Sequence, residues 1–163
     1  MICRRLHLII FTTFLLSCTQ SQVMSTSTNP NDRVTSMNQE KEEREREVKQ
    51  LVKELTNNDI TWDGQDIGIV AILKSNRAKR LVEIGEPAIP ELIAAMSDES
   101  KFAVAHVILT YISKVEFTTI PWNGLEVNLS FDGRTLFNPD QRFDLVKRWH
   151  QWYRSTPRPN TLP

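Results

Sequence analysis

The chain has 163 residues, 20 Lys and Arg against 20 Asp and Glu, 40% hydrophobic residues and 2 cysteines, which is room for one ordinary domain. This composition excludes a nucleic-acid binder with a strongly basic surface and a small disulfide-rich scaffold. We find no phosphate-binding loop, Cys/His cluster or nucleophile elbow among the motifs, so the sequence names no reaction and no cofactor.

Residues 1–17 have the pattern of a signal peptide. Arg4 and Arg5 form a short basic region, and a mostly apolar run follows from Leu6 to Leu16. A membrane-spanning helix needs about 20 apolar residues, so we expect a cleaved leader rather than a permanent transmembrane segment. Removing the two arginines leaves 18 basic against 20 acidic residues, a net charge of −2.

The end of this leader, Leu15-Leu16-Ser17-Cys18, resembles the lipobox of bacterial lipoproteins. The resemblance implies cleavage between Ser17 and Cys18, a thioether from Cys18 to diacylglycerol, and acylation of the new amino group. Two or three acyl chains, at about 0.8 kcal/mol per buried methylene, hold a protein firmly on a bilayer. The alternative is an ordinary signal peptide that ends in a cysteine.

The predicted destination follows from the residue after Cys18. In lipoproteins of enterobacteria an Asp there favours retention in the inner membrane, and this chain has Thr19. The resemblance therefore favours the inner leaflet of the outer membrane if the cell has one, and an envelope with a single membrane stays open. Since Cys3 leaves with the leader and Cys18 carries lipid, the mature chain would have no thiol for catalysis, metal binding or a disulfide.

Residues 18–37 are rich in Ser, Thr, Asn and Gln and predict a disordered tether, with a reach of roughly 24 Å. Residues 38–156 form the predicted single domain, and residues 157–163 a Pro-rich tail. The domain begins with consecutive charges over 40–47, whose i,i+4 pairs favour a solvated helix. Apolar residues then follow at helical spacing, so the second half of this helix should dock while the charged half forms a stalk; they are Val48, Leu51, Val52 and Leu55.

The next segment, 57–65, has the composition of a turn around Trp62, with Asp63-Gly64 at its tightest point. The apolar residues of 67–74 and 77–84 predict two helices, and Gly85 ends the second. Pro87 then opens a further helix at its first turn.

The stretch 78–113 resembles a short HEAT repeat of the type first associated with phycobilisome lyases. The pieces that carry this resemblance are Leu81, Ile84-Gly85, Pro87-Ala88-Ile89-Pro90, Leu92-Ile93, Asp98 and the small apolar residues of 103–112. It implies a helix pair, with Asp98 or Ser100 capping its second helix and the helices of 67–84 forming a second, degenerate unit. A bilin lyase activity is the weakest implication, because the family's longer array is missing.

The apolar period changes to two near residue 115 and predicts two or three antiparallel strands within 115–137, with Asp132-Gly133 as a hairpin turn. A last helix opens at Asn138-Pro139-Asp140. Its predicted apolar face consists of Phe143, Val146, Trp149 and Tyr153, with Leu145 and Trp152 beside it. The expected fold class is therefore mainly α, a short HEAT-like stack with a β-hairpin element and a closing C-terminal helix.

Side chains with chemical potential are few. His106 lies in an apolar helix, where a core or groove histidine is the first interpretation and a ligand or general base the second. His150 is expected on the surface. Asp59, Asp63 and Asp66 share one loop but lack the order of a calcium loop, so no metal site is predicted.

The sequence has 4 tryptophans, which is many for so small a domain. Trp122 and Trp149 are expected in the core, while Trp62 and Trp152 are candidates for a binding face that would suit a sugar ring or a peptide. The favoured function is a lipid-anchored envelope lipoprotein that offers a helical platform to a protein partner, not an enzyme. The alternatives are a cell-wall or glycan binding module that uses tryptophan and a small envelope enzyme that uses His106, and the oligomeric state stays open.

Overall fold

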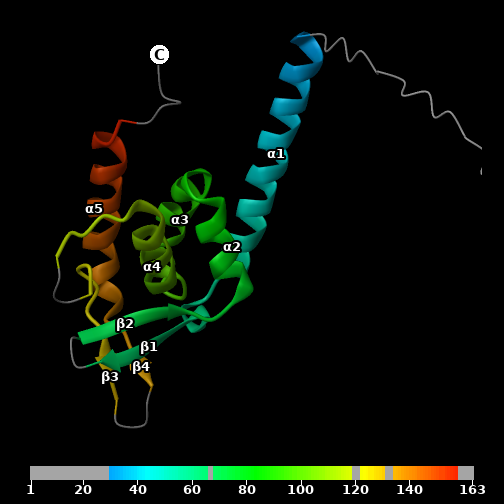
Figure 1. Ribbon diagram of the computed structural model, residues 1–163. Helices are drawn as coiled ribbons and strands as arrows, with labels where there is room; N and C mark the ends of the chain where they lie inside the picture. Colours follow the sequence, from blue (N-terminus) through cyan, green and yellow to red (C-terminus); the bar gives the residue numbers. More distant parts are fainter. Residues whose placement is uncertain (1–29, 66–67, 119–121, 131–133, 158–163) are drawn as a thin grey trace, which may run out of the picture.

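The computed structural model describes residues 30–65, 68–118, 122–130 and 134–157 (Figure 1). The predicted leader, Cys18 and the first part of the predicted tether lie outside the described residues, as do Asp66, Ile67, Asp132-Gly133 and residues 158–163. The described chain is mainly α-helical, with small antiparallel strand pairs and a C-terminal helix, which confirms the predicted fold class.

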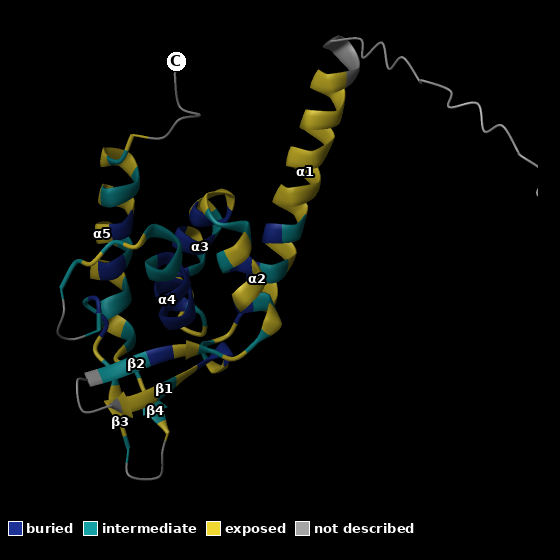
Figure 2. Cartoon of the chain, in the orientation of Figure 1, coloured by how far each residue is buried: buried dark blue, intermediate teal, exposed yellow. Residues whose placement is uncertain are grey.

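Helix α1, Pro30–Glu54, projects from the rest of the domain (Figure 1). It begins inside the predicted tether, so residues 30–37 are helical, contrary to the expected disorder. Residues 33–46 are exposed, whereas Val48 and Val52 are buried (Figure 2). Within the exposed part, Lys41 Nζ and Glu45 Oε1 form an i,i+4 ion pair at 4.0 Å. The predicted division into a polar half and a docked half is therefore confirmed.

A compact stack of helices follows from residue 76. It consists of α2 (Asn76–Ile84), a 3₁₀ turn (Glu86–Ala88), α3 (Ile89–Ala95) and α4 (Phe102–Ser113). Ser75 caps α2 by accepting a hydrogen bond from the Ala78 amide at 3.1 Å, and Gly85 ends it at a φ of 76°. These boundaries agree with the predicted Gly85 and Pro87 signals, and α4 is the most buried helix (Figure 2).

The start of α4 differs from the prediction. Asp98 binds the amide and hydroxyl of Ser100, and neither side chain caps the helix. Asn57 caps it from far along the chain, since its Oδ1 accepts from the amides of Ala103 and Val104 at 3.1 and 3.3 Å. Its Nδ2 also donates to the Glu99 carbonyl at 2.8 Å.

A β-hairpin lies where a turn and a helix were predicted. Strands β1 (Ile60–Gln65) and β2 (Gly68–Leu73) pair antiparallel, with Trp62 opposite Ala71. The helix predicted over 67–74 is therefore wrong, and with it the second HEAT-like helix pair. Short apolar runs fit either element, and the β-branched residues of Gly68–Leu73 favour a strand once a neighbour is present.

The second hairpin is shorter than predicted. Strands β3 (Asn128–Leu129) and β4 (Thr135–Leu136) form an antiparallel pair, whereas the described residues 114–118 contain no strand. Asn123 holds this segment instead, because its side chain accepts from the Phe117 amide at 2.6 Å and donates to the Val115 carbonyl at 3.0 Å. Buried side-chain hydrogen bonds replace the ladder that the alternating pattern predicted.

Helix α5 (Arg142–Ser155) closes the domain after a 3₁₀ turn (Pro139–Gln141). Asn138 caps the turn by accepting from the Asp140 amide at 3.0 Å, as predicted. Leu145 and Trp149 are buried, but Phe143 is 65% exposed, so its assignment to the apolar face is wrong. The Arg142 guanidinium lies 4.4 Å from the centre of the Phe143 ring, in a cation–π contact.

The core is continuous from the docked end of α1 to α5. Its largest fully buried side chains include Leu55, Leu81, Leu92, Phe102 and Trp149, which belong to different elements. Of the helices that the structure describes, none has the length and apolarity needed to cross a membrane.

Candidate functional site

The candidate residues Trp62, His106 and Trp152 belong to one aromatic cluster that joins β1, α4, α5 and the segment before β3. Each ring meets the next edge-on or tilted, with ring centres 4.8 to 6.2 Å apart. We call these side chains the aromatic cluster: Trp62, Phe102, His106, Phe117, Trp122, Phe137, Trp149 and Trp152.

His106 lies at the centre of the cluster. Its side chain is fully buried between Trp122, 5.9 Å away, and Trp149, 5.8 Å away. The indole N–H of Trp149 donates to His106 Nδ1 at 2.9 Å. Because Nδ1 accepts this bond, the neutral imidazole carries its proton on Nε2.

Burial is the main cause of an altered proton affinity at His106. The pKa of His106 is lowered from 6.5 to about 3, mainly because burial removes the hydration of the charged form, with a smaller contribution from the positive charge of Arg148. The backbone around Trp122 and Asn123 opposes this shift in part. The histidine is therefore neutral at ordinary pH and acts as an acceptor for Trp149.

Unpartnered donors remain inside the domain. Within the described residues, Trp62 Nε1, His106 Nε2 and Arg142 Nε are buried without a hydrogen-bond partner. Buried N–H groups nearly always donate a hydrogen bond, so these three atoms are exceptions to the usual pairing of buried polar groups. The first two belong to rings that both contact Trp122, at 5.4 Å from Trp62 and 5.9 Å from His106.

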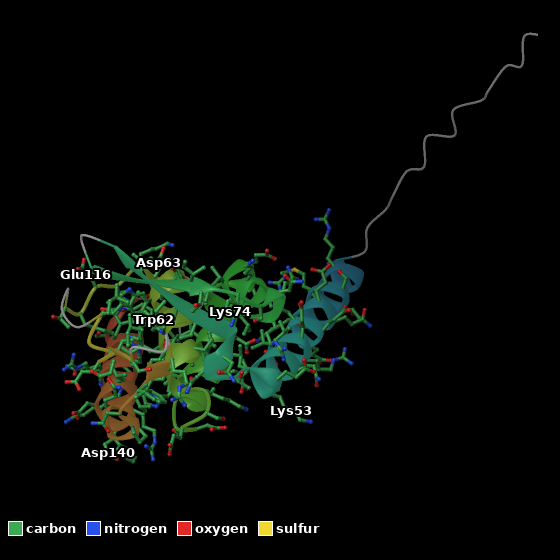
Figure 3. The ribbon with its side chains drawn as sticks, turned by 90° about the horizontal axis from the view of Figure 1, so that it is seen from below. Lys53, Trp62, Asp63, Lys74, Glu116 and Asp140 are labelled. Atoms are coloured by element: carbon green, nitrogen blue, oxygen red, sulfur yellow. The ribbon has the colours of Figure 1, made fainter. Side chains whose placement is uncertain are left out.

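The tryptophans of the cluster cover one another. Trp62 meets Trp122 at 5.4 Å and Phe137 at 6.2 Å, and Trp152 meets Trp149 at 5.3 Å. Trp149 is fully buried, as predicted, while Trp62, Trp122 and Trp152 are half-buried. Figure 3 shows Trp62 between the β1–β2 hairpin and the helices beyond it. The two candidate binding tryptophans are thus engaged in packing.

The loop carboxylates have separate structural settings. Asp59 is 7% exposed, accepts from the Thr56 amide at 2.8 Å and lies 3.5 Å from Arg77 Nε. Asp63 is exposed on β1, and His150 is exposed on α5. Across the described parts of the chain, no three His, Cys, Asp or Glu side chains are grouped so that they could hold a metal ion.

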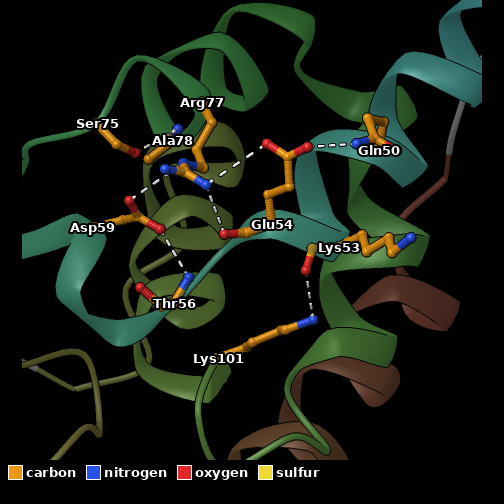
Figure 4. Close-up of polar contacts among 9 residues, drawn as sticks. All are labelled: Gln50, Lys53, Glu54, Thr56, Asp59, Ser75, Arg77, Ala78 and Lys101. Atoms are coloured by element: carbon orange, nitrogen blue, oxygen red, sulfur yellow. Dashed lines mark hydrogen bonds and ion pairs between the residues drawn. The ribbon is translucent and has the colours of Figure 1, made fainter.

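A polar joint fixes α1 to the domain (Figure 4). Arg77 of α2 donates to the Glu54 carbonyl at 2.8 Å and also approaches the Glu54 and Asp59 carboxylates. Lys101 donates to the Lys53 carbonyl at 3.1 Å, next to the start of α4. The last carbonyls of a helix have no partner within it, so these two cations satisfy the end of α1 and set its direction.

A second link to α1 is made by Glu47, about two helical turns before the joint at Glu54. The Arg80 guanidinium donates to Glu47 through Nε at 2.7 Å and through Nη2 at 3.3 Å. The hydrogen bond from Arg80 lowers the pKa of Glu47, and the same pair raises the pKa of Arg80. This bidentate contact joins α1 to α2 at the point where α1 leaves the domain.

Sequence motifs missed the roles of two residues that organise the region, Asn57 and Asn123. Asparagine often occurs in turns, so its presence alone did not distinguish a buried cap from a surface turn. The dipeptide Asn123-Gly124 could have indicated a tight turn, because Asn and Gly tolerate positive φ more readily than other residues. In the structure their φ angles are 46° and 90°.

No protein-family model, curated protein or solved structure matches this chain. The resemblances to the lipobox and to a HEAT repeat therefore rest on the residues quoted for them.

Proposed function

We propose that the chain is a lipoprotein of a bacterial envelope, held by lipid on Cys18, that displays its helical domain to a protein partner. The lipobox-like Leu15-Leu16-Ser17-Cys18 motivates the anchor. Helix α1 is the structural observation that carries the arrangement, because half of it leaves the domain.

The exposed part of α1 has the properties of a spacer. A helix that is polar on all sides bridges two separated bodies, is stabilised by i,i+4 pairs, or is not stable, and this part of α1 is mostly polar apart from the exposed Val34 and Met37. Residues 33–46 are exposed, and the 14 residues of such a segment span about 21 Å. Residues 19–29 separate Cys18 from Pro30, so the lipid would lie at the far end of this spacer.

The attachment of α1 supports a fixed distance rather than a loose leash. Arg77, Arg80 and Lys101 bind the end of α1 or its last exposed turns. The docked part of α1 and the residue after it contribute three buried side chains to the core, those of Val48, Val52 and Leu55. A domain so held would stand off the bilayer at a distance set by α1 and the residues before it.

The platform is proposed by analogy with helical-repeat proteins, which usually present surfaces to other proteins. In this chain α4 is buried while α2 displays Lys79, Arg80 and Glu83. The aromatic cluster is occupied by its own contacts. The outer helical surface is therefore the region that we assign to a partner.

Lipidation is tested first. Cells expressing the full chain receive an alkyne-tagged fatty acid, and the purified protein is examined for the tag by mass spectrometry, with Cys18→Ala as the matched variant. We expect a tagged peptide that begins at Cys18 in the original chain and none in the variant. An unmodified Cys18 would contradict the anchor.

Partner binding is tested in the same membranes. The acylated chain and the Cys18→Ala chain are crosslinked in place and recovered, and proteins enriched only with the acylated form are identified. A defined protein whose purified form binds the domain supports the platform. Recovery of cell-wall fragments without a protein contradicts it and favours the glycan alternative, which Trp62 and Trp152 substitutions then test.

A further inference from the structure

Among the described residues, strand β1 is paired along one edge only, with β2. Residue pairs of an antiparallel hairpin alternate between those that exchange hydrogen bonds and those that do not. The Lys74 amide donates to the Asp59 carbonyl at 2.8 Å, which fixes the alternation. The backbone N–H and C=O groups that point toward β2 are therefore those of Asp59, Thr61, Asp63 and Gln65. The backbone groups that point away from β2 are those of Ile60, Trp62 and Gly64.

The other edge of the hairpin is covered. The Tyr111 hydroxyl of α4 donates to the Ala71 carbonyl, which points outward from β2. In the view of Figure 1, β2 lies between β1 and α4. Among the described residues, no strand other than β2 pairs with β1, and no backbone hydrogen bond outside the regular helices and strands engages Trp62 or Gly64.

β1 lacks the features that usually protect such an edge. Native edge strands carry proline, lysine or a bulge, or another element covers them. Strand β1 reads Ile-Thr-Trp-Asp-Gly-Gln and pairs with β2 in an unbroken register. A Cβ added at Gly64 would meet no atom within 4 Å, so the face of the sheet has room for a side chain at this position.

We propose that this edge pairs with the same strand of a second copy of the chain, antiparallel and centred on Trp62. Trp62 then lies opposite Trp62 of the second copy, and Ile60 lies opposite Gly64 of that copy. Each of these pairs exchanges two backbone hydrogen bonds, about six in all. The two hairpins become one four-stranded sheet with a two-fold axis, the commonest symmetry of soluble oligomers.

The side chains of β1 suit this register. Thr61 lies opposite Asp63 of the second copy, so a hydroxyl donor meets a carboxylate and the two Asp63 charges are not directly opposed. Gly64 leaves room beside Ile60 of the second copy. Each Trp62 indole already packs against Trp122 and Phe137 of its own chain. With equal numbers of acidic and basic residues, the chain has little net charge to oppose association.

The first test is sedimentation equilibrium of the full chain without substitutions, in mild detergent, which measures the mass of the assembly. A dimer that dissociates on dilution is expected, and a monomer at every concentration overturns the proposal. The matched variants are Gly64→Pro, which removes an outward N–H without touching the β1–β2 bonds, and Gly64→Ala, which keeps it. Gly64→Pro should abolish the dimer and Gly64→Ala should retain it. Equal dimerisation by both variants overturns the assignment to this edge.

Cysteine crosslinking tests the register. Full chains with Thr61→Cys are mixed with full chains with Asp63→Cys and oxidised, and the peptide linking positions 61 and 63 is quantified by mass spectrometry. Directly opposed Cβ atoms are about 5 Å apart and diagonal ones 7–8 Å, so the mixture should give about tenfold more linked peptide than either variant alone. Thr61→Cys mixed with Ile72→Cys, which is exposed on β2, is the control. Equal linkage in the control overturns the register.

The proposed dimer and the proposed function can be refuted independently of each other. A monomer leaves the lipid on Cys18 and the helical platform untouched, because neither depends on β1. Binding of a partner's extended peptide to this edge would show as a monomer whose complex is lost in Gly64→Pro, and it too would overturn the self-pairing.

Discussion

The indole N–H of Trp149 and Nδ1 of His106 form a 2.9 Å hydrogen bond between two fully buried side chains. This bond is the polar contact that joins α5 to α4 within the aromatic cluster. It requires an unprotonated Nδ1, because a charged imidazole would present an N–H to another N–H. The docking of α5 is thus linked to the protonation state of one residue.

The first prediction concerns pH. The pKa of His106 is about 3 in the folded chain and 6.5 when unperturbed. Above pH 6.5 the imidazole is neutral in both states, so its protonation does not reduce the free energy of unfolding. As the pH falls from 6.5 toward 3, the unfolded chain takes up a proton that the folded chain does not. The free energy of unfolding should fall by about 1.4 kcal/mol per pH unit in this range from His106 alone.

His106→Gln separates this contribution from those of the carboxylates. A glutamine oxygen can accept from Trp149 but does not titrate, so the difference between the two chains should shrink or reverse as the pH falls. Urea denaturation followed by far-UV circular dichroism at several pH values measures it. Parallel pH curves for the two chains would show that His106 is not the titrating group.

The second prediction concerns Trp149. Trp149→Phe removes the donor to His106 Nδ1 and part of the volume that fills the centre of the cluster. We expect a loss of about 2–4 kcal/mol in the free energy of unfolding. Trp152→Phe, at a half-buried site one turn along α5, should cost less. Chemical denaturation monitored by circular dichroism compares them, and equal losses would contradict the central position of Trp149.

The third prediction concerns the cap of α4. Asn57→Ala removes the acceptor for the amides of Ala103 and Val104 and the donor to the Glu99 carbonyl. The expected loss is about 1–2 kcal/mol. Asn58→Ala, at the exposed neighbouring position, is the matched control and should change stability little. Hydrogen exchange at the first turn of α4 should rise in Asn57→Ala and stay unchanged in Asn58→Ala.

The fourth prediction concerns the polar joint. Arg77→Ala leaves the Glu54 carbonyl and the Asp59 carboxylate without this cation (Figure 4). Because Arg77 is partly exposed, we expect a loss of only about 1 kcal/mol. Hydrogen exchange should increase in the docked part of α1, residues 48–54, more than in α5. A uniform increase across the domain would show that the joint does not act locally on α1.

Much of the fold was predictable where the signal lies within one element. Gly85 and Asn138 mark helix ends through their own local bonds or backbone angles, and the structure confirms both predictions. The change from charged to apolar residues near Val48 placed the docking point of α1 correctly. Such signals depend on neighbours in the sequence, which a single chain displays.

The errors arose where distant residues decide the outcome. Gly68–Leu73 reads equally as a helix or a strand, and its pairing with β1 and the bond from Tyr111 settle it. Phe143 fits the helical period of α5, yet the core lies on the side of Leu145. His106 and the four tryptophans were recognised singly, but only the packing of α4, α5 and β1 brings them together.

The cap that Asn57 provides has a consequence for how the chain acquires its structure. A ribosome releases the N-terminal residues first, so Asn57 emerges before Ala103 and Val104, the amides that it binds. The first turn of α4 therefore cannot be completed by its own residues as it is made. Its completion requires contact with Asn57, which lies in the 3₁₀ turn just after α1, and this couples two segments far apart in sequence into one cooperative step.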